Sequence, residues 1–174
     1  MITIYLDRDG VLCNFDKRFM ELFSHREYDP RLFRQAVLDR KIFLDLEWMP
    51  NGLNLYRGVM SIPAHLARVE ILSSTGTAET LIRHEAMVQK QQWLFHHDIS
   101  LPANFSSSKR EKAKWSHPRA ILIDDREGCV EPFRLSGGRA ILHRDEYWQD
   151  TLDQLTYHVK DCWTRDNLCG NIDL

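Results

Sequence analysis

The chain has 174 residues, 43% of them hydrophobic, which suits one domain with a sizeable core. Its formal net charge of −2 provides no large basic surface, so nucleic acid is not an expected partner. No run of about 18 apolar residues occurs, so we expect no membrane-spanning helix. The first residues lack the regions of a signal peptide, and the expected location is therefore the cytoplasm, where the four cysteines would be reduced thiols.

The first predicted element is a short buried strand over residues 2–6, with Asp7, Asp9 and Gly10 directly after it. Asp and Gly are ordinary turn residues, so a simple turn is one interpretation of this stretch. The other is a functional site, because a buried carboxylate is costly unless it is paired or binds a metal.

Two helical segments are expected next. Phe15, Phe19 and Phe23 recur at helical spacing. Asp29 and Pro30 form a typical helix start, with Asp as the N-cap and Pro at the first helical position. Apart from Phe15, these segments lie in the region 16–48, which comes after the first strand and the residues 7–15 that follow it.

The rest of the chain alternates between predicted strands and helices. In chain order these are a helix from the break at 49–52 to about residue 60, a strand at 67–76, a helix at 77–97, a short strand near 104–107, strands at 119–125 and 139–143, and a helix from about 148 to 159. Leu81, Ile82, Val88 and Trp93 are expected on the buried side of the helix at 77–97. This alternation predicts an α/β fold with a mostly parallel sheet flanked by helices.

Three predicted strands end in polar residues. These are Asp7 and Asp9 directly after the first strand, Ser73, Ser74 and Thr75 at the end of the strand at 67–76, and Asp124 and Asp125 at the end of the strand at 119–125. In parallel sheets, ligands bind at the carboxyl ends of the strands. If these strands are neighbours, the three clusters meet at one edge, which favours a site over a set of turns.

The residue types in these clusters suit phosphate chemistry. Clustered carboxylates repel one another unless a cation neutralises them, and oxygen ligands favour Mg²⁺. A carboxylate can also act as a nucleophile. The hydroxyls of Ser74 and Thr75 and the backbone near Gly76 suit phosphate oxygens. A lysine from Lys109, Lys112 and Lys114 would add positive charge, although two of the three are expected on a solvated face.

The stretches "DRDGV" (7–11), Ser74, the lysines of 109–114 and "ILIDD" (121–125) resemble, in order, the four motifs of the haloacid dehalogenase superfamily of phosphatases. A closer resemblance is to the 5′(3′)-deoxyribonucleotidases, whose "DMDGVLADF", "FFLDLEPIPG" and "LLIDD" are similar to "DRDGVLCNF", "IFLDLEWMPNG" and "ILIDD" here. In that family a lysine precedes the first aspartate of the last motif by ten residues, and Lys114 has this spacing from Asp124.

The resemblance implies a role for each matching residue. Asp7 would be the nucleophile and Asp9 the general acid and base, while Ser74 and Lys114 would hold the phosphoryl group, with Lys109 or Lys112 as alternatives to Lys114. Mg²⁺ would be bound by Asp7, by the backbone carbonyl of Asp9, and by Asp125 directly with Asp124 behind it, or with these last two exchanged.

The resemblance also implies a domain division: a core of residues 1–15 and 49–174, and a small helical cap at 16–48 that selects the substrate. Phe15 and Phe43 match aromatic residues that contact the base, and core packing is the alternative for both. The cap is shorter than in the animal enzymes, which leaves the substrate less defined than the chemistry.

The resemblance therefore implies a Mg²⁺-dependent hydrolase for nucleoside monophosphates. The alternatives are a phosphatase for nucleic-acid 3′ ends, because a short cap leaves an open site, and a non-catalytic nucleotide-binding module. A module would have no need for the second acid at Asp9. Whether the chain forms a homodimer is left open.

Overall fold

The computed structural model describes residues 1–24 and 29–169. Five strands form one parallel sheet in the order β3-β2-β1-β4-β5. The strands are β1 (Ile2–Leu6), β2 (Ala67–Ser74), β3 (Ala103–Ser106), β4 (Ala120–Asp124) and β5 (Arg139–Leu142). Leu6 at the end of β1 is paired with Ile71 of β2 and Ile123 of β4. The polar residues after β1 therefore lie between the ends of β2 and β4, as the sequence predicts.

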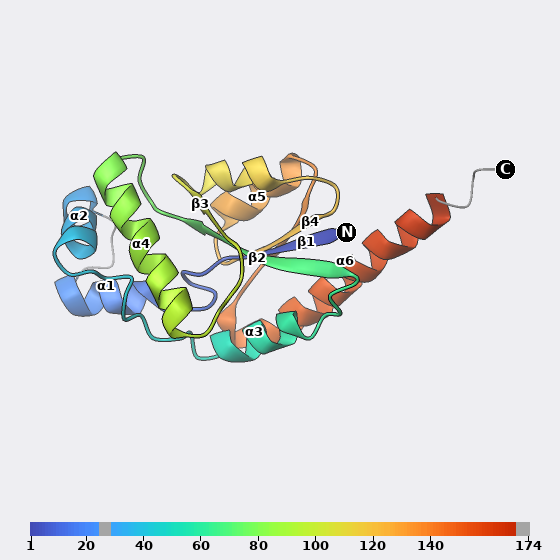
Figure 1. Ribbon diagram of the computed structural model, residues 1–174, viewed down its shortest axis with the longest axis horizontal. Coiled ribbons are helices and arrows are strands. Elements are labelled where there is room, and N and C mark those ends of the chain that lie inside the picture. The colour runs from blue at the N-terminus through green and yellow to red at the C-terminus, as the bar shows by residue number, and fades with distance from the viewer. Residues whose placement is uncertain (25–28, 170–174) are drawn as a thin grey trace.

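Helices cover both faces of the sheet and one end of it. They are α1 (Phe15–Phe23), α2 (Pro30–Leu38), α3 (Gly52–Met60), α4 (Thr80–His96), α5 (Glu127–Leu135) and α6 (Trp148–Cys169), with short 3-10 helices η1 (Arg110–Trp115) and η2 (Asp145–Tyr147). Figure 1 shows α5 on one side of the sheet and α3 with α6 on the other, while α1, α2 and α4 gather beyond the carboxyl ends of the strands. The α/β prediction is confirmed.

Alternation along the strands produces two hydrophobic cores. Ile4 and Leu6 of β1 face the larger core, while Tyr5 between them faces the smaller one against α5. The same alternation in β4 places Ile121 and Ile123 on the first side and Leu122 on the second. This period of two is expected for strands buried on both faces.

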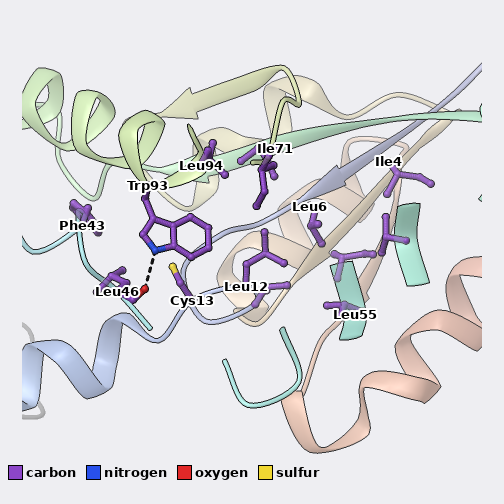
Figure 2. Packing of buried hydrophobic residues seen from close by; sticks show 14 of the residues in the cluster. Ile4, Leu6, Leu12, Cys13, Phe43, Leu46, Leu55, Ile71, Trp93 and Leu94 are labelled. Atoms are coloured by element: carbon purple, nitrogen blue, oxygen red, sulfur yellow. Dashed lines mark hydrogen bonds between the residues drawn. The ribbon is translucent and has the colours of Figure 1, made fainter. Parts of the chain in front are cut away.

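Trp93 of α4 anchors the segment that follows α2. Its indole N–H donates to the carbonyl of Leu46 at 2.8 Å, and the ring is fully buried beside Cys13 and Leu12 (Figure 2). Since a buried indole N–H must find an acceptor, this bond fixes the position of the chain at Leu46. The segment carrying Phe43 and Leu46 is thus part of the main core.

Two helices differ in detail from their sequence-based predictions. The last helix extends to Cys169 rather than to about 159, because no Gly or Pro occurs between Trp148 and Cys169 to end it. In α4, Ile82 and Trp93 are buried as predicted, but Leu81 is 57% exposed. The start of α2 is confirmed, since the Asp29 side chain accepts a hydrogen bond from the N–H of Arg31.

Two further findings concern the chain as a whole. Within residues 1–24 and 29–169, no helix is both long and apolar enough to cross a membrane. Cys13, Cys129 and Cys162 are buried. Residues 25–28 of the predicted cap lie outside the described residues.

Candidate active site

The structure brings three carboxylates together at the carboxyl ends of β1 and β4. Asp7 follows β1, Asp124 ends β4, and Asp125 is the next residue; one oxygen of each lies within 4.8 Å of the others. The side chains of Asp7 and Asp124 are buried, and that of Asp125 is 17% exposed. Adjacent parallel strands thus convert two distant sequence motifs into one acidic cluster.

A buried lysine, Lys112, neutralises part of this charge. Its ammonium group lies 2.8 Å from Asp7 Oδ1 and 2.6 Å from Asp124 Oδ2. Burial acts to lower the pKa of Lys112, but the two carboxylates outweigh it and raise the pKa. Lys112 therefore remains a fixed positive charge directly beside Asp7.

Lys114, the lysine favoured by sequence spacing, does not lie in the cluster. Its side chain is 70% exposed and pairs with Glu111 at 2.5 Å. The reason is the local helix type: η1 is a 3-10 helix with three residues per turn, so Lys112 and the partly buried Trp115 share its inner face. The expected position of Lys114 is wrong, and Lys112 occupies it. Lys109, the other alternative, is exposed.

The acidic cluster has free ligand atoms suited to a divalent cation. Within the described part of the chain, Asp125 Oδ1 is buried and accepts no hydrogen bond, and Asp7 Oδ1 accepts none with good geometry although Lys112 lies close to it. Burial, with the neighbouring carboxylates, raises the pKa of Asp7 to about 7 and that of Asp125 to about 6. A bound cation would relieve this electrostatic repulsion between buried acids, and carboxylate oxygens are ligands that suit Mg²⁺.

Asp124 and Asp125 have different surroundings. Both oxygens of Asp124 are used by the protein, because Oδ2 binds Lys112 and Oδ1 accepts the N–H of Arg126 at 3.0 Å. Asp125 has one oxygen without a partner and the other 2.9 Å from the Arg126 guanidinium. This difference favours Asp125 as the direct metal ligand and Asp124 as the residue that holds Lys112.

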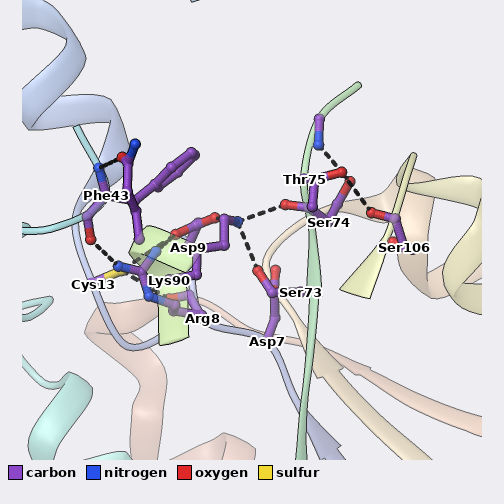
Figure 3. Close-up of polar contacts among 12 residues, drawn as sticks. Asp7, Arg8, Asp9, Cys13, Phe43, Ser73, Ser74, Thr75, Lys90 and Ser106 are labelled. Atoms are coloured by element: carbon purple, nitrogen blue, oxygen red, sulfur yellow. Dashed lines mark hydrogen bonds and ion pairs between the residues drawn. The ribbon is translucent and has the colours of Figure 1, made fainter. Parts of the chain in front are cut away.

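Asp9 lies in a separate ionic cluster that sequence reasoning missed. Arg8 Nη1 lies 2.5 Å from Asp9 Oδ1, and the Lys90 ammonium of α4 contacts Asp9 Oδ2 (Figure 3). Burial alone would raise the pKa of Asp9, but Lys90 and Arg8 outweigh it and hold the pKa below its usual value. The signal in the sequence was Lys90 itself, a charged residue at helical spacing from Ala86 and Trp93 on the buried face of α4.

The residues at the end of β2 differ in what they can offer a ligand. Ser74 is partly exposed, and its Oγ accepts the N–H of Gly76 at 3.1 Å. Thr75 is fully buried, and its hydroxyl contacts two backbone carbonyls, those of Thr77 and Ser106, both at 3.1 Å. Gly76 has φ +75° and lies against Phe33 of α2. Of the two hydroxyls, that of Ser74 is the one open to a ligand.

The two aromatic residues expected at the substrate are largely packed. Phe43 is 2% exposed, with the Phe15 ring stacked on it and the Lys90 ammonium 4.4 Å from its centroid. Phe15 is partly exposed and also stacks on Phe19, with 5.6 Å between centroids. Phe43 therefore has no open face for a ligand in this structure, which corrects its expected contact with substrate.

No family model and no curated protein sequence matches this chain. Among solved structures, it is similar to a haloacid dehalogenase-like family hydrolase from Streptococcus pneumoniae (13% identity, TM-score 0.43, covering 80% of this chain and 83% of that one). It is also similar to D,D-heptose 1,7-bisphosphate phosphatase from Burkholderia thailandensis (10% identity, TM-score 0.47, covering 87% and 99%). A third is a hydrolase from Streptococcus pneumoniae TIGR4 (11% identity, TM-score 0.49, covering 87% and 98%).

Proposed function

We propose that this protein is a Mg²⁺-dependent phosphomonoesterase in which Asp7 is the nucleophile. The observation that carries the proposal is the group of Asp7, Lys112, Asp124 and Asp125, with Lys112 2.8 Å from Asp7 and 2.6 Å from Asp124. A buried carboxylate beside a fixed ammonium and a set of cation ligands is the arrangement that attack on a phosphoryl group requires.

In the first step, an Asp7 carboxylate oxygen forms a bond to phosphorus while the bond from phosphorus to the leaving oxygen breaks. The leaving oxygen takes up a proton from Asp9 in its protonated form, for which the carboxyl group must release one of its contacts with Lys90 and Arg8. Lys112 and the Ser74 hydroxyl hold the phosphoryl oxygens. When bound by Asp7, Asp125 and the Asp9 carbonyl, Mg²⁺ would neutralise the carboxylates and polarise the phosphoryl group.

In the second step, water attacks the aspartyl phosphate and gives its proton to Asp9. The bond between phosphorus and the Asp7 oxygen breaks, so inorganic phosphate leaves and Asp7 is restored. The same carboxyl group thus acts as acid and then as base. Asp9 lies two residues after Asp7, at the same strand end.

Within this class we propose a nucleoside monophosphate as the substrate. The support is the joint match of three separated segments of the sequence to the nucleotidases, together with the partial exposure of Phe15 at the start of α1. A phosphate-release screen over mononucleotides, sugar phosphates and 3′-phosphorylated oligonucleotides, with Mg²⁺ and with chelator, tests both the Mg²⁺-dependent phosphatase activity and the proposed substrate. Full activity in excess chelator would exclude the metal role, and a preference for oligonucleotides would favour 3′-end processing.

The role of Phe15 is tested by Phe15→Ala. If a base stacks on this ring, an interaction worth about 1–3 kcal/mol is lost, so kcat/KM for nucleotides falls roughly 5- to 150-fold. A small phosphate ester without a base should be almost unaffected. Equal losses on both substrates would mean that Phe15 serves only the packing with Phe19 and Phe43.

A further inference from the structure

Lys90 is a charged residue in the hydrophobic interior. Its side chain is fully buried on α4, one turn from Ala86 and Trp93, which are also fully buried. Burying an ammonium group is unfavourable unless its hydrogen bonds are satisfied. A hydrophobic residue would fill this place at no such cost, so the charge calls for an explanation.

The contacts of Lys90 satisfy its three donors. The ammonium contacts Asp9 Oδ2, donates to Ser73 Oγ at 3.0 Å and donates to the carbonyl of Ser74 at 2.6 Å (Figure 3). These acceptors come from two different segments, the loop after β1 and the end of β2. Lys90 therefore links the position of Asp9 to that of Ser74.

Arg8 holds the other oxygen of the same carboxylate. Its Nη1 binds Asp9 Oδ1, and Nη2 donates to the carbonyl of Phe43 at 2.7 Å. The guanidinium also lies 4.7 Å from the centroid of the Trp93 ring. With a cation on each oxygen, the Asp9 carboxylate is fixed in rotation as well as in position.

We propose that Lys90 is a positioning residue that acts through Asp9: it holds the Asp9 carboxylate in register with the phosphoryl site at Ser74. This inference rests on the proposed phosphomonoesterase function. A general acid contributes about 10²–10⁴-fold to rate, and only when it lies within hydrogen-bond reach of the leaving oxygen. Misorientation of Asp9 should therefore lower the rates of the steps that need a proton and leave the rates of the other steps unchanged.

The test compares two substrates that differ in their need for an acid. An alkyl phosphate, such as a nucleoside monophosphate, has a strongly basic leaving oxygen, whereas p-nitrophenyl phosphate releases a stable phenolate that needs no proton. The parameter is kcat/KM, because it reports the steps up to the phosphorylation of Asp7. For Lys90→Met we expect a loss of roughly 10²-fold on the alkyl ester and less than about 3-fold on the aryl ester.

A double-mutant cycle separates action through Asp9 from direct action on phosphate. In the Asp9→Asn background, Lys90→Met should cause no further loss on either substrate. The control variant is Lys41→Met. It removes a half-exposed lysine that pairs at 2.9 Å with Glu85 of α4, the helix that also carries Lys90. It should leave both activities unchanged.

Thermal unfolding of each variant shows whether it folds. Should Lys90→Met not fold, Lys90→Gln keeps a donor at this position, and the neutral pair Asp9→Asn/Lys90→Met removes both charges at once. Equal losses on the two substrates, or a further loss in the Asp9→Asn background, would overturn the inference and leave the phosphatase proposal standing. A wild-type protein that hydrolyses neither ester would overturn both.

Discussion

At the scale of single residues, the acidic cluster depends on a balance of charge. Asp7, Asp124 and Asp125 lie within reach of one another, and Lys112 is the cation placed between the first two. Close carboxylates raise one another's pKa, and an ammonium group opposes this effect. Lys112 therefore stabilises the ionised carboxylates, and under the proposed function it also presents a positive charge to the phosphoryl group of the substrate.

The first prediction compares two lysines of η1. Lys112→Met should lower kcat/KM about 10²- to 10³-fold, since it removes a charged group that stabilises the transferring phosphoryl oxygens. Lys114→Met should have almost no effect, because Lys114 is exposed and pairs with Glu111 rather than with the acidic cluster. Steady-state kinetics of the two variants decide the point. A larger loss for Lys114→Met would restore the assignment based on sequence spacing.

The second prediction concerns Gly10, which has φ +84° and lies against Asp125. A Cβ at Gly10 would be 2.5 Å from Asp125 Oδ2, so Gly10→Ala must displace this carboxylate. We expect a 10- to 100-fold weaker affinity for Mg²⁺, the usual effect of disturbing a neighbour of a metal ligand, and about 1–2 kcal/mol lower stability from backbone strain.

Gly128→Ala is the matched control for Gly10→Ala. A Cβ at Gly128 meets no atom within 4 Å, and the residue lies in α5. Since alanine is the better helix former, this variant should be neutral or more stable by about 0.5–1 kcal/mol. Calorimetric titration with Mg²⁺ and thermal unfolding measure both effects. Unchanged Mg²⁺ affinity in Gly10→Ala would argue against Asp125 as a ligand.

At the scale of elements, the C-terminal end of α4 is joined to the core through His97. The indole N–H of Trp48 donates to His97 Nδ1 at 3.1 Å, and the His97 ring lies 4.2 Å from that of Trp93. Burial, with Arg8 nearby, lowers the pKa of His97 below the ordinary value of 6.5. Protonation at Nδ1 would remove the acceptor that Trp48 uses.

The third prediction is a loss of stability on acidification. The pKa of His97 is lower in the folded state, so the unfolded state binds the proton more tightly. The contribution of His97 is thus complete above pH 6.5 and lost as pH falls below this value. In His97→Asn, whose Oδ1 can accept from Trp48 without titrating, the drop in Tm between pH 7.5 and 5.5 should be smaller.

The exposed neighbour His96 provides the control, because His96→Gln should keep the wild-type pH dependence. Equal pH dependence of Tm in wild type and His97→Asn would contradict the role assigned to His97. The comparison uses differences in Tm within each variant, so a uniform change in stability does not affect it.

The elements also show which features the sequence could predict. The strands and the start of α2 follow from local signals, apolar runs and the Asp29–Pro30 pair, and these predictions are confirmed. Local signals do not show which lysine of η1 faces the core. The spacing of ten residues before Asp124 favoured Lys114, but this spacing does not reveal that the segment is a 3-10 helix with Lys112 on its inner side. In α4, periodicity identified Trp93, but Lys90 is buried for an electrostatic reason that hydrophobic patterns do not reveal.

At the scale of the whole molecule, the site results from strand order. With β1 between β2 and β4, the ends of these three strands are neighbours, and this could be predicted once a parallel sheet was assumed. The ion pairs of Asp9 with Arg8 and Lys90 could not be predicted, because they depend on how α4 packs across the loop after β1. Sequence motifs thus located the carboxylates, while tertiary packing determines which lysine and arginine side chains form ion pairs with them.

Helix α2 and the segment after it are bonded to the core from several sides. Phe43 accepts from Arg8 through its carbonyl, Gln89 donates to the carbonyl of Val37 at 2.8 Å, and Trp93 donates to that of Leu46. Two of these donors belong to α4, the helix that carries Lys90. The region predicted as a cap is therefore continuous with the packing that orients Asp9.

The turnover of Asp7→Asn tests the central claim most directly. The amide has the shape of the carboxylate but cannot attack phosphorus, so we predict a loss in kcat of at least about 10⁴-fold with p-nitrophenyl phosphate and Mg²⁺. Thermal unfolding should show a folded protein, because the change removes one charge from a cluster of three buried or half-buried acids. Turnover at the wild-type rate in a clean preparation of Asp7→Asn would contradict the account.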